Sequence, residues 1–203
     1  MIVDLSHEIA AGMFTGLFEI GPLSVFGNIG TYLDAPYRYD ADRADLARLP
    51  LERLVDVSIT IVSAIGRTAV TAADLGDPGQ LWGRAVLVHT GWARHWATPR
   101  YLDPDCPHLT PDAVDKLVDA NAALVGIDSP HIDDPADPNR LARRRLLGAD
   151  IPIIEHLTNL ESVPGTGARL IALPPPIRAM ASFPVRAVAV YDGSGSHQPA
   201  AVR

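Results

Sequence analysis

Five short apolar runs recur along the chain, separated by segments that contain polar residues, glycine and proline. They are LVDVSITIVSAI (54–65), RAVLVHT (84–90), AALVGID (122–128), RLIALP (169–174) and VRAVAVYD (185–192). The runs are rich in valine and isoleucine, and several lack the strict alternation of a strand with one wet face. This pattern predicts five β-strands, several of them buried on both faces.

Two segments between the runs have a helical pattern instead. Residues 110–122 (TPDAVDKLVDANA) begin with Thr110 as the expected N-cap, and Pro111 follows at the first helical position. Apolar side chains then recur on one helical face, at Val114, Leu117 and Val118. Residues 139–150 (NRLARRRLLGAD) predict a second helix that Gly148 ends.

The order of these elements predicts a mixed α/β fold. The chain contains 18 prolines and 16 glycines spread along its whole length, which indicates many ordered loops rather than one linker. No internal repeat or domain boundary is visible, so residues 1–203 are expected to form a single domain. The last segment, 192–203 (DGSGSHQPAAVR), is expected to be a mobile tail.

Composition and charge limit the kinds of molecule that the protein is expected to bind. The chain has 203 residues, 47% of them hydrophobic, and carries a formal net charge of −7. This acidic balance gives no basic field for nucleic acid or anionic lipid, and no apolar run is long enough to span a bilayer. The start of the chain lacks a secretory signal pattern, and one cysteine, Cys106, excludes an internal disulfide. We therefore expect a cytoplasmic protein whose partner is a small molecule or another protein.

Most motifs of known catalytic sites are absent from the sequence. It has no glycine-rich phosphate loop and no CxxC, HExxH or GxSxG pattern. Ser196 and His197 fall in the expected tail, outside any strand–turn–helix context. The other histidines are scattered and read as structural or surface residues: His7, His89, His95, His108 and His156.

Residues 28–38 (NIGTYLDAPYR) have the shape of a metal-binding loop but contain one good metal ligand, Asp34. Glycine permits a tight turn, and the Ala-Pro pair stiffens the chain after the aspartate.

Several segments, in order, resemble the cyclase superfamily, which includes bacterial kynurenine formamidase and isatin hydrolase. They are VDLSHEIAAGM, GTYLDAPYRY, VLVHTGWARHW, VGIDSPHID, RRLLGADIPIIEHLTNL and the closing LIALPPPIRAMASFPVRAVAVYD. The resemblance covers about residues 2–192. It implies a swivelling β/β/α fold, with a mixed sheet or barrel and flanking helices, and a homo-oligomer such as a dimer or tetramer. It also implies hydrolysis of amide bonds by a water that zinc or manganese activates.

The chain departs from the pattern of this family at its functional positions. The resemblance places two lost metal-ligand histidines at Asn28 and Tyr32, and a lost proton-transfer histidine at Arg38. It places a third lost histidine, before the LLGA turn, at Arg143. Asp34 is kept, and so is Glu155 on the following strand.

These exchanges predict a site without metal or other cofactor. Two inward carboxylates, Asp34 and Glu155, need counter-charge, and Arg38 and Arg143 supply it where a metal charge would lie. Asp34 is therefore expected within ion-pair reach of one of these arginines. The alternative is an ion-pair network that only fills a pocket, and the remaining arginines, 140, 144 and 145, read as a solvated helix face.

Three functions remain open. The first is a metal-independent enzyme that acts on a small cyclic or acyl substrate by proton transfer, in cyclisation, dehydration or isomerisation, in a biosynthetic setting. Tyr32, with its pKa lowered by Arg38, would be the acid or base, and His131 is a second candidate base. The second is a non-catalytic binding or scaffold protein, and the third a metal-dependent amidohydrolase. The first hypothesis assigns two sets of residues: Tyr32, Asp34, Arg38 and His131 to catalysis, and Asn28, Tyr37, Arg143 and Glu155 to substrate binding.

Overall fold

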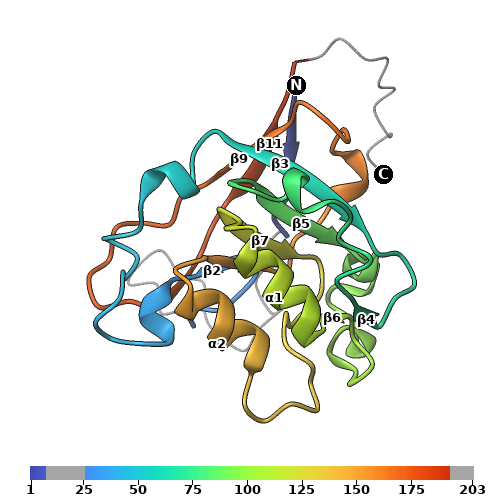
Figure 1. The fold of residues 1–203 in the computed structure, drawn as a ribbon, viewed down its shortest axis with the longest axis horizontal. Coiled ribbons are helices and arrows are strands. Elements are labelled where there is room, and N and C mark those ends of the chain that lie inside the picture. Colours follow the sequence, from blue (N-terminus) through green and yellow to red (C-terminus); the bar gives the residue numbers. More distant parts are fainter. Residues whose placement is uncertain (8–25, 193–203) are drawn as a thin grey trace.

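The computed structural model describes residues 1–7 and 26–192, and a nine-stranded mixed sheet forms its centre (Figure 1). The strand order is β1-β11-β9-β3-β5-β7-β8-β2-β10. The strands are β1 (Ile2–Asp4), β2 (Tyr32–Asp34), β3 (Val57–Ser63), β5 (Ala85–His89), β7 (Leu124–Ile127), β8 (Ile153–Glu155), β9 (Arg169–Ala172), β10 (Ser182–Pro184) and β11 (Ala187–Val190). A small second sheet pairs β4 (Ala69–Val70) with β6 (His108–Leu109).

All five strands predicted from the apolar runs are confirmed as β3, β5, β7, β9 and β11. The four central strands, β3, β5, β7 and β8, run parallel. All four residues of β7 and the first four residues of β5 are buried. Parallel strands covered on both faces read as continuous apolar runs, which explains why this part of the sheet was visible in the sequence.

Two helices, α1 (Pro111–Asp119) and α2 (Leu141–Gly148), lie side by side on one face of the sheet (Figure 1). Ala113, Val114 and Leu117 of α1 are buried, as the periodicity predicted. Thr110 occupies the N-cap position, but its hydroxyl donates to the carbonyl of Val70 rather than capping the helix.

The core is divided by the sheet, because successive side chains of a strand point to opposite faces. Val86 and Val88 of β5 pack with the helices, whereas Leu87 packs with a second cluster on the other face. Gly126 of β7 leaves room for this packing: a Cβ there would lie 2.6 Å from Leu157 Cδ1 and 2.7 Å from Leu87 Cδ2, so these side chains would have to shift.

The prediction of a loop over residues 28–38 is corrected, because Tyr32–Asp34 within it forms strand β2. This strand lies between β8 and β10, with Tyr32 opposite Glu155 and Asp34 opposite Ser182. The register therefore places the two carboxylates expected at the site on adjacent strands.

No helix among residues 1–7 and 26–192 has the length and apolar character needed to cross a membrane. Residues 193–203 of the expected tail, with Ser196 and His197, lie outside the described residues.

Candidate functional site

Arg143, on the third position of α2, is the centre of a buried polar cluster. Its guanidinium contacts three carboxylates: Nη1 lies 2.5 Å from Asp34 Oδ2, Nη2 lies 2.5 Å from Glu155 Oε1, and Nε lies 3.2 Å from Asp133 Oδ2. Its backbone N–H also donates to Asp133 Oδ1. All three carboxylate side chains are fully buried, and that of Arg143 is 10% exposed.

Four further donors complete the cluster. Arg38 Nη1 donates to Asp34 Oδ1 at 2.7 Å, and the Ser182 hydroxyl donates to the same oxygen. The hydroxyl of Tyr32 donates to Glu155 Oε2, and the backbone N–H of Ile132 donates to Glu155 Oε1 at 2.7 Å. Each oxygen of Asp34 and Glu155 therefore accepts at least one hydrogen bond, as buried carboxylates require. The predicted ion pair of Asp34 is confirmed, and it involves both arginines.

The electrostatics of the two carboxylates differ. Burial raises the pKa of Asp34, Glu155 acts in the same direction, and Arg143 and Arg38 offset this only in part. Burial also acts to raise the pKa of Glu155, but Arg143 and the hydrogen bond from Tyr32 outweigh it, and its pKa is lowered. Three acids here face two guanidinium groups, so a proton on Asp34 would bring the cluster into balance.

The pKa of Tyr32 is shifted in the direction opposite to the predicted one. Burial, followed by the negative charges of Glu155 and Asp34, raises the pKa of Tyr32 well above its ordinary value. The expectation that Arg38 lowers this pKa is wrong, because Arg38 is partly exposed and is engaged by Asp34. Tyr32 is therefore a neutral hydrogen-bond donor at neutral pH.

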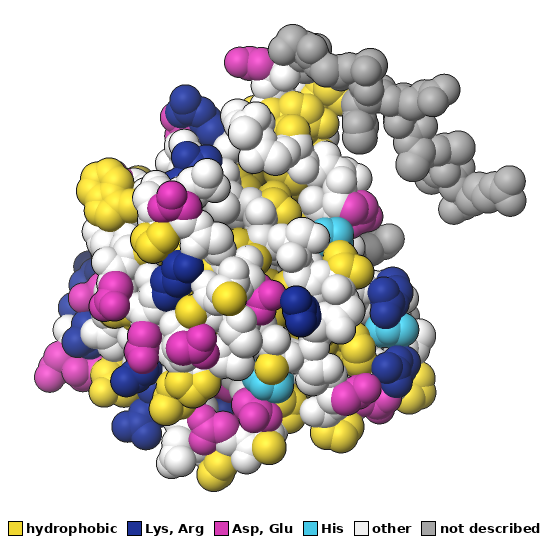
Figure 2. Space-filling view, turned by 45° about the vertical axis from the view of Figure 1, so that its right-hand side comes forward, with side chains coloured by type: hydrophobic (Ala, Val, Ile, Leu, Met, Phe, Trp, Pro, Cys, Tyr) yellow, Lys and Arg dark blue, Asp and Glu magenta, His cyan; other side chains and the backbone are white. Residues whose placement is uncertain are grey.

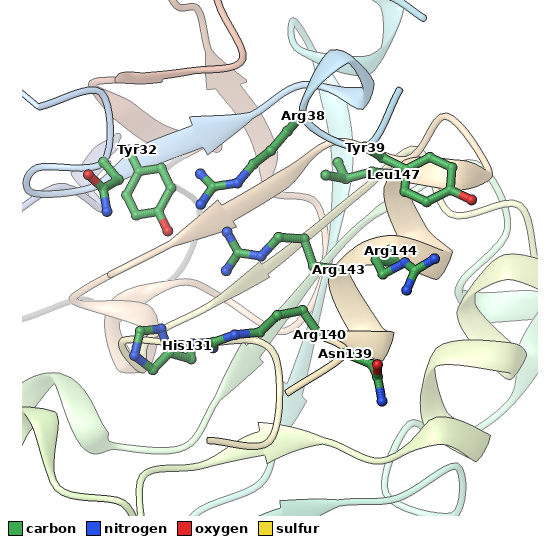
Figure 3. Close-up of a pocket in the computed structure, with 10 residues that line it drawn as sticks. Tyr32, Arg38, Tyr39, His131, Asn139, Arg140, Arg143, Arg144 and Leu147 are labelled. Atoms are coloured by element: carbon green, nitrogen blue, oxygen red, sulfur yellow. The ribbon is translucent and has the colours of Figure 1, made fainter. Parts of the chain in front are cut away.

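A cavity of about 600 Å³ lies over this cluster. Its wall contains four arginines and no acidic residue, although the whole chain is acidic and the surface in Figure 2 mixes both signs. In Figure 3, the side chains of Arg38, Arg140 and Arg143 extend towards the side of the cavity where Tyr32 and His131 lie. The lining residues are Asn28, Tyr32, Arg38, Tyr39, His131, Asn139, Arg140, Arg143, Arg144 and Leu147.

The structure brings five of the predicted site residues to the cavity wall: Asn28, Tyr32, Arg38, His131 and Arg143. Asp34 and Glu155 do not line the cavity themselves. They bind three side chains that do, those of Tyr32, Arg38 and Arg143. Tyr37 is half-buried and does not line the cavity, so the structure does not support its predicted contact with substrate.

Sequence reasoning missed two kinds of residue here. Asp133 and Ser182 complete the buried cluster, and no local pattern marks either of them. Tyr39, Asn139, Arg140 and Arg144 line the cavity, although the two arginines read as a solvated helix face. Their spacing of four residues, with Arg143 between them, was the signal that could have indicated a shared helical face.

His131 is half-buried at the cavity wall, and burial lowers the pKa of its imidazole. Its neighbours in sequence do not bind its ring. Asp128 accepts hydrogen bonds from the backbone of Thr90 and Gly91, and Asp133 binds Arg143. The imidazole is therefore neutral at neutral pH.

A histidine–aromatic cluster adjoins Tyr32, whose ring centroid lies 5.4 Å from that of His156. His7 stacks on Trp96 with ring centroids 4.0 Å apart, and His156 Nδ1 lies 3.2 Å from the hydroxyl of Tyr101. Burial lowers the pKa of both histidines to about 4. Both rings are thus uncharged at neutral pH and serve the packing of this region.

The donors at the family's metal positions do not suit a divalent metal ion. Zinc is bound by imidazole, thiolate and carboxylate groups with free lone pairs. Here Asn28 and Tyr32 replace two of the histidines that the resemblance leads one to expect, and a guanidinium occupies the space between the carboxylates. Within the described ranges, no group of three or more His, Cys, Asp and Glu side chains is arranged to hold a metal ion.

Fold and cluster together define an α/β protein with a mixed sheet and an arginine-centred polar site. A family model described as putative cyclase matches residues 3–134, and the chain belongs to this cyclase family. The kynurenine formamidase of Paracidovorax citrulli (strain AAC00-1) is 31% identical over 176 residues, covering 84% of this chain and 79% of that protein. The kynurenine formamidase of Maricaulis maris (strain MCS10) is 29% identical over 170 residues, with the same coverages.

Solved structures share the fold. Isatin hydrolase A from Labrenzia aggregata, bound to benzyl benzoate, aligns with a TM-score of 0.78 and 22% identity over 93% of each chain. Isatin hydrolase A from Ralstonia solanacearum aligns with a TM-score of 0.80 and 20% identity, over 95% of this chain and 92% of that one. The predicted cyclase-like fold is thus confirmed.

Proposed function

We propose that this chain is a metal-independent enzyme of the cyclase family that moves a proton on a small carbonyl substrate. The observation that carries the proposal is the position of Arg143, whose charge lies between Asp34 and Glu155, at the wall of a cavity that also contains a neutral imidazole. Cyclisation, dehydration and isomerisation can each begin with such a proton transfer next to a carbonyl group.

His131 is the base in this proposal. A base must be unprotonated at the working pH and must face the substrate. The lowered pKa of His131 meets the first condition, and its place in the cavity wall meets the second. Tyr32 is unsuited to this role, because its hydroxyl already donates to Glu155 and its pKa is raised.

Arg38 would stabilise the oxyanion that forms when His131 removes the proton, whereas Arg143, which three buried carboxylates bind, would hold the site in place. Guanidinium groups fixed in advance bind developing negative charge without reorganising, which lowers the barrier to reaction. Asp34 acts as a positioning residue, since it binds one nitrogen of each arginine. The amide of Asn28, at the same wall, supplies one further hydrogen bond to the substrate.

The relatives named kynurenine formamidase and isatin hydrolase favour hydrolysis as a second possibility. Hydrolysis needs an activated water, and the buried carboxylates are fully engaged by arginine, tyrosine, serine and backbone donors. Among the described residues, no group of three or more His, Cys, Asp and Glu side chains is arranged to hold a metal ion that would activate such a water. Proton transfer without a nucleophilic water therefore fits these residues better.

The test is exchange of carbon-bound hydrogen in D2O, followed by NMR, with 3-benzoylpropionate and levulinate as probes. The proposal expects exchange next to the carbonyl that is faster than in buffer and is lost in His131→Asn. His95→Asn is the matched control, because His95 does not line the cavity, and it should retain exchange. Binding of the probes without any exchange would overturn the enzyme proposal and favour a non-catalytic binding protein.

A further inference from the structure

A second hollow of about 320 Å³ lies next to the main cavity. It is lined by Tyr39, Asn139, Leu141, Arg144, Arg145 and Gly148. Three of these residues, Tyr39, Asn139 and Arg144, also line the main cavity. They form the junction between the two spaces, and all three side chains carry hydrogen-bond donors.

The junction is positively charged and contains no acidic side chain. Within the described ranges, the guanidinium of Arg144 has no carboxylate within 4.0 Å and lies 5.9 Å from the ring centroid of Tyr39. Arg143, one residue earlier, differs because three buried carboxylates neutralise it. Arg144 thus keeps its charge available for a ligand.

The side chains at the junction lie at the opposite end of the cavity from the reacting groups. Figure 3 shows Tyr39, Asn139 and Arg144 on one side, and Tyr32 and His131 on the other. An elongated ligand that meets His131 at one end would extend towards Arg144 at the other. This separation divides the cavity into a reacting end and a distal end.

We propose that the junction of Tyr39, Asn139 and Arg144 is a distal oxyanion site, which selects an elongated ligand with a carboxylate or phosphate remote from its reacting carbonyl. The guanidinium of Arg144 binds the oxyanion, and the amide of Asn139 and the hydroxyl of Tyr39 donate further hydrogen bonds to it. The inference names the substrate class of the function proposed above, yet the binding itself does not require His131 to act as a base.

The experiment is calorimetric titration of the full chain with straight-chain dicarboxylates from glutarate to azelate, each beside its monomethyl ester, at constant ionic strength. Both members of a pair have the same reach, but the ester has one charge fewer. We expect the best diacid to bind at least about tenfold more tightly than its ester, as one charge-assisted contact provides. The preference should weaken as salt is added, because the site is partly exposed.

Two variants assign the preference to the junction. Arg144→Gln should reduce it to less than about twofold, whereas Arg144→Lys should keep part of it. Arg178→Gln is the matched control, because it removes an exposed arginine that lines neither space and should leave the preference unchanged. Circular dichroism should show all three variants folded, since Arg144 is exposed.

A third variant tests whether the ligand extends into the second hollow. A Cβ on Gly148 would lie 3.4 Å from Tyr39 Cε1, so Gly148→Leu should fill part of this space. This variant should weaken the binding of azelate, the longer diacid, more than the binding of glutarate. Equal binding of diacid and ester, an unchanged preference in Arg144→Gln, or no saturable binding of any diacid would overturn the proposal.

The outcome is separable from that of the proposed enzyme activity. His131→Asn should retain the diacid preference while losing hydrogen exchange. A preserved preference in a protein that exchanges no hydrogen would leave the distal site in place and remove only the catalytic proposal. Hydrogen exchange without any preference for the diacid would leave the catalytic proposal in place and remove the distal site.

Discussion

The guanidinium of Arg143 lies 2.5 Å from a carboxylate oxygen of Asp34, although 109 residues separate the two in sequence. Asp34 ends strand β2 and Arg143 lies in helix α2, so the ion pair ties the helix to the sheet. Because Arg143 also binds Glu155 and Asp133, one cation is the shared partner of three buried carboxylates.

Removing this cation should destabilise the protein strongly. Arg143→Met leaves three buried carboxylates with one remaining guanidinium partner, Arg38, and should lower the free energy of unfolding by about 3–5 kcal/mol. Urea denaturation measures the change. Arg145→Met is the control, because Arg145 forms an exposed pair with Asp115 and should cost at most about 1 kcal/mol. Similar losses in both variants would contradict a central role of Arg143.

The purified protein should hold no stoichiometric zinc or manganese. Asn28, Tyr32, Arg38 and Arg143 stand where the resemblance places histidines, and the carboxylate oxygens are engaged by other donors. Elemental analysis after gentle purification should find far less than one metal ion per chain, and chelators should leave the melting temperature unchanged. One metal ion per chain would refute this prediction.

A zinc site should be recoverable by restoring the histidines. Arg38→His combined with Arg143→His should first lower stability at neutral pH, because Asp34 and Glu155 lose their counter-charge. Adding Asn28→His and Tyr32→His should then allow zinc to raise the melting temperature. The same four-fold variant with Asp34→Asn is the control and should respond less. A zinc response in the parent protein would show that the four exchanges are irrelevant.

The protein should not hydrolyse N-formylkynurenine appreciably, with or without added zinc. The reason is the engagement of Asp34 and Glu155 by arginine, which leaves these carboxylates unavailable to hold a metal-activated water. Release of formate, followed against a kynurenine formamidase as positive control, measures the reaction. Robust turnover would show that the present site can perform the hydrolysis for which the relatives are named.

Stability should fall as the pH drops from about 6.5 towards 4, in part through His156. Its pKa is about 4 in the folded protein and near the ordinary value of 6.5 in the unfolded chain, so the unfolded chain binds more protons in this window. The contribution of His156 is present above 6.5 and is lost on acidification, amounting to about 2 kcal/mol after allowance for partial exposure. His7 contributes in the same direction.

Unfolding measured at pH 7 and pH 5 should therefore show a smaller difference for His156→Asn than for the parent. Asp34 acts in the opposite direction, because its raised pKa favours the folded state at lower pH, and comparing the variant with the parent cancels its effect. An unchanged difference between the two pH values would mean that His156 is not the group responsible.

The central strands and both helices could be predicted from the sequence, because burial on two faces or on one helical face leaves a local pattern of apolar residues. Strands β5 and β7 and helix α1 illustrate this. Strand β2 could not be recognised in the same way, since it has three residues and carries the polar side chains of the site. Its pairing with β8 and β10 comes from strands more than a hundred residues away.

The identity of several residues at the site also followed from the sequence, because the resemblance places lost histidines at Asn28, Tyr32, Arg38 and Arg143. Their arrangement in space did not follow from the sequence. Only the tertiary structure places Asp133 and Ser182 against the same cluster and turns Arg144 towards Tyr39. It also decides that the pKa of Tyr32 rises rather than falls, because a pKa depends on burial and on the distance to each charge, and neither is a property of local sequence.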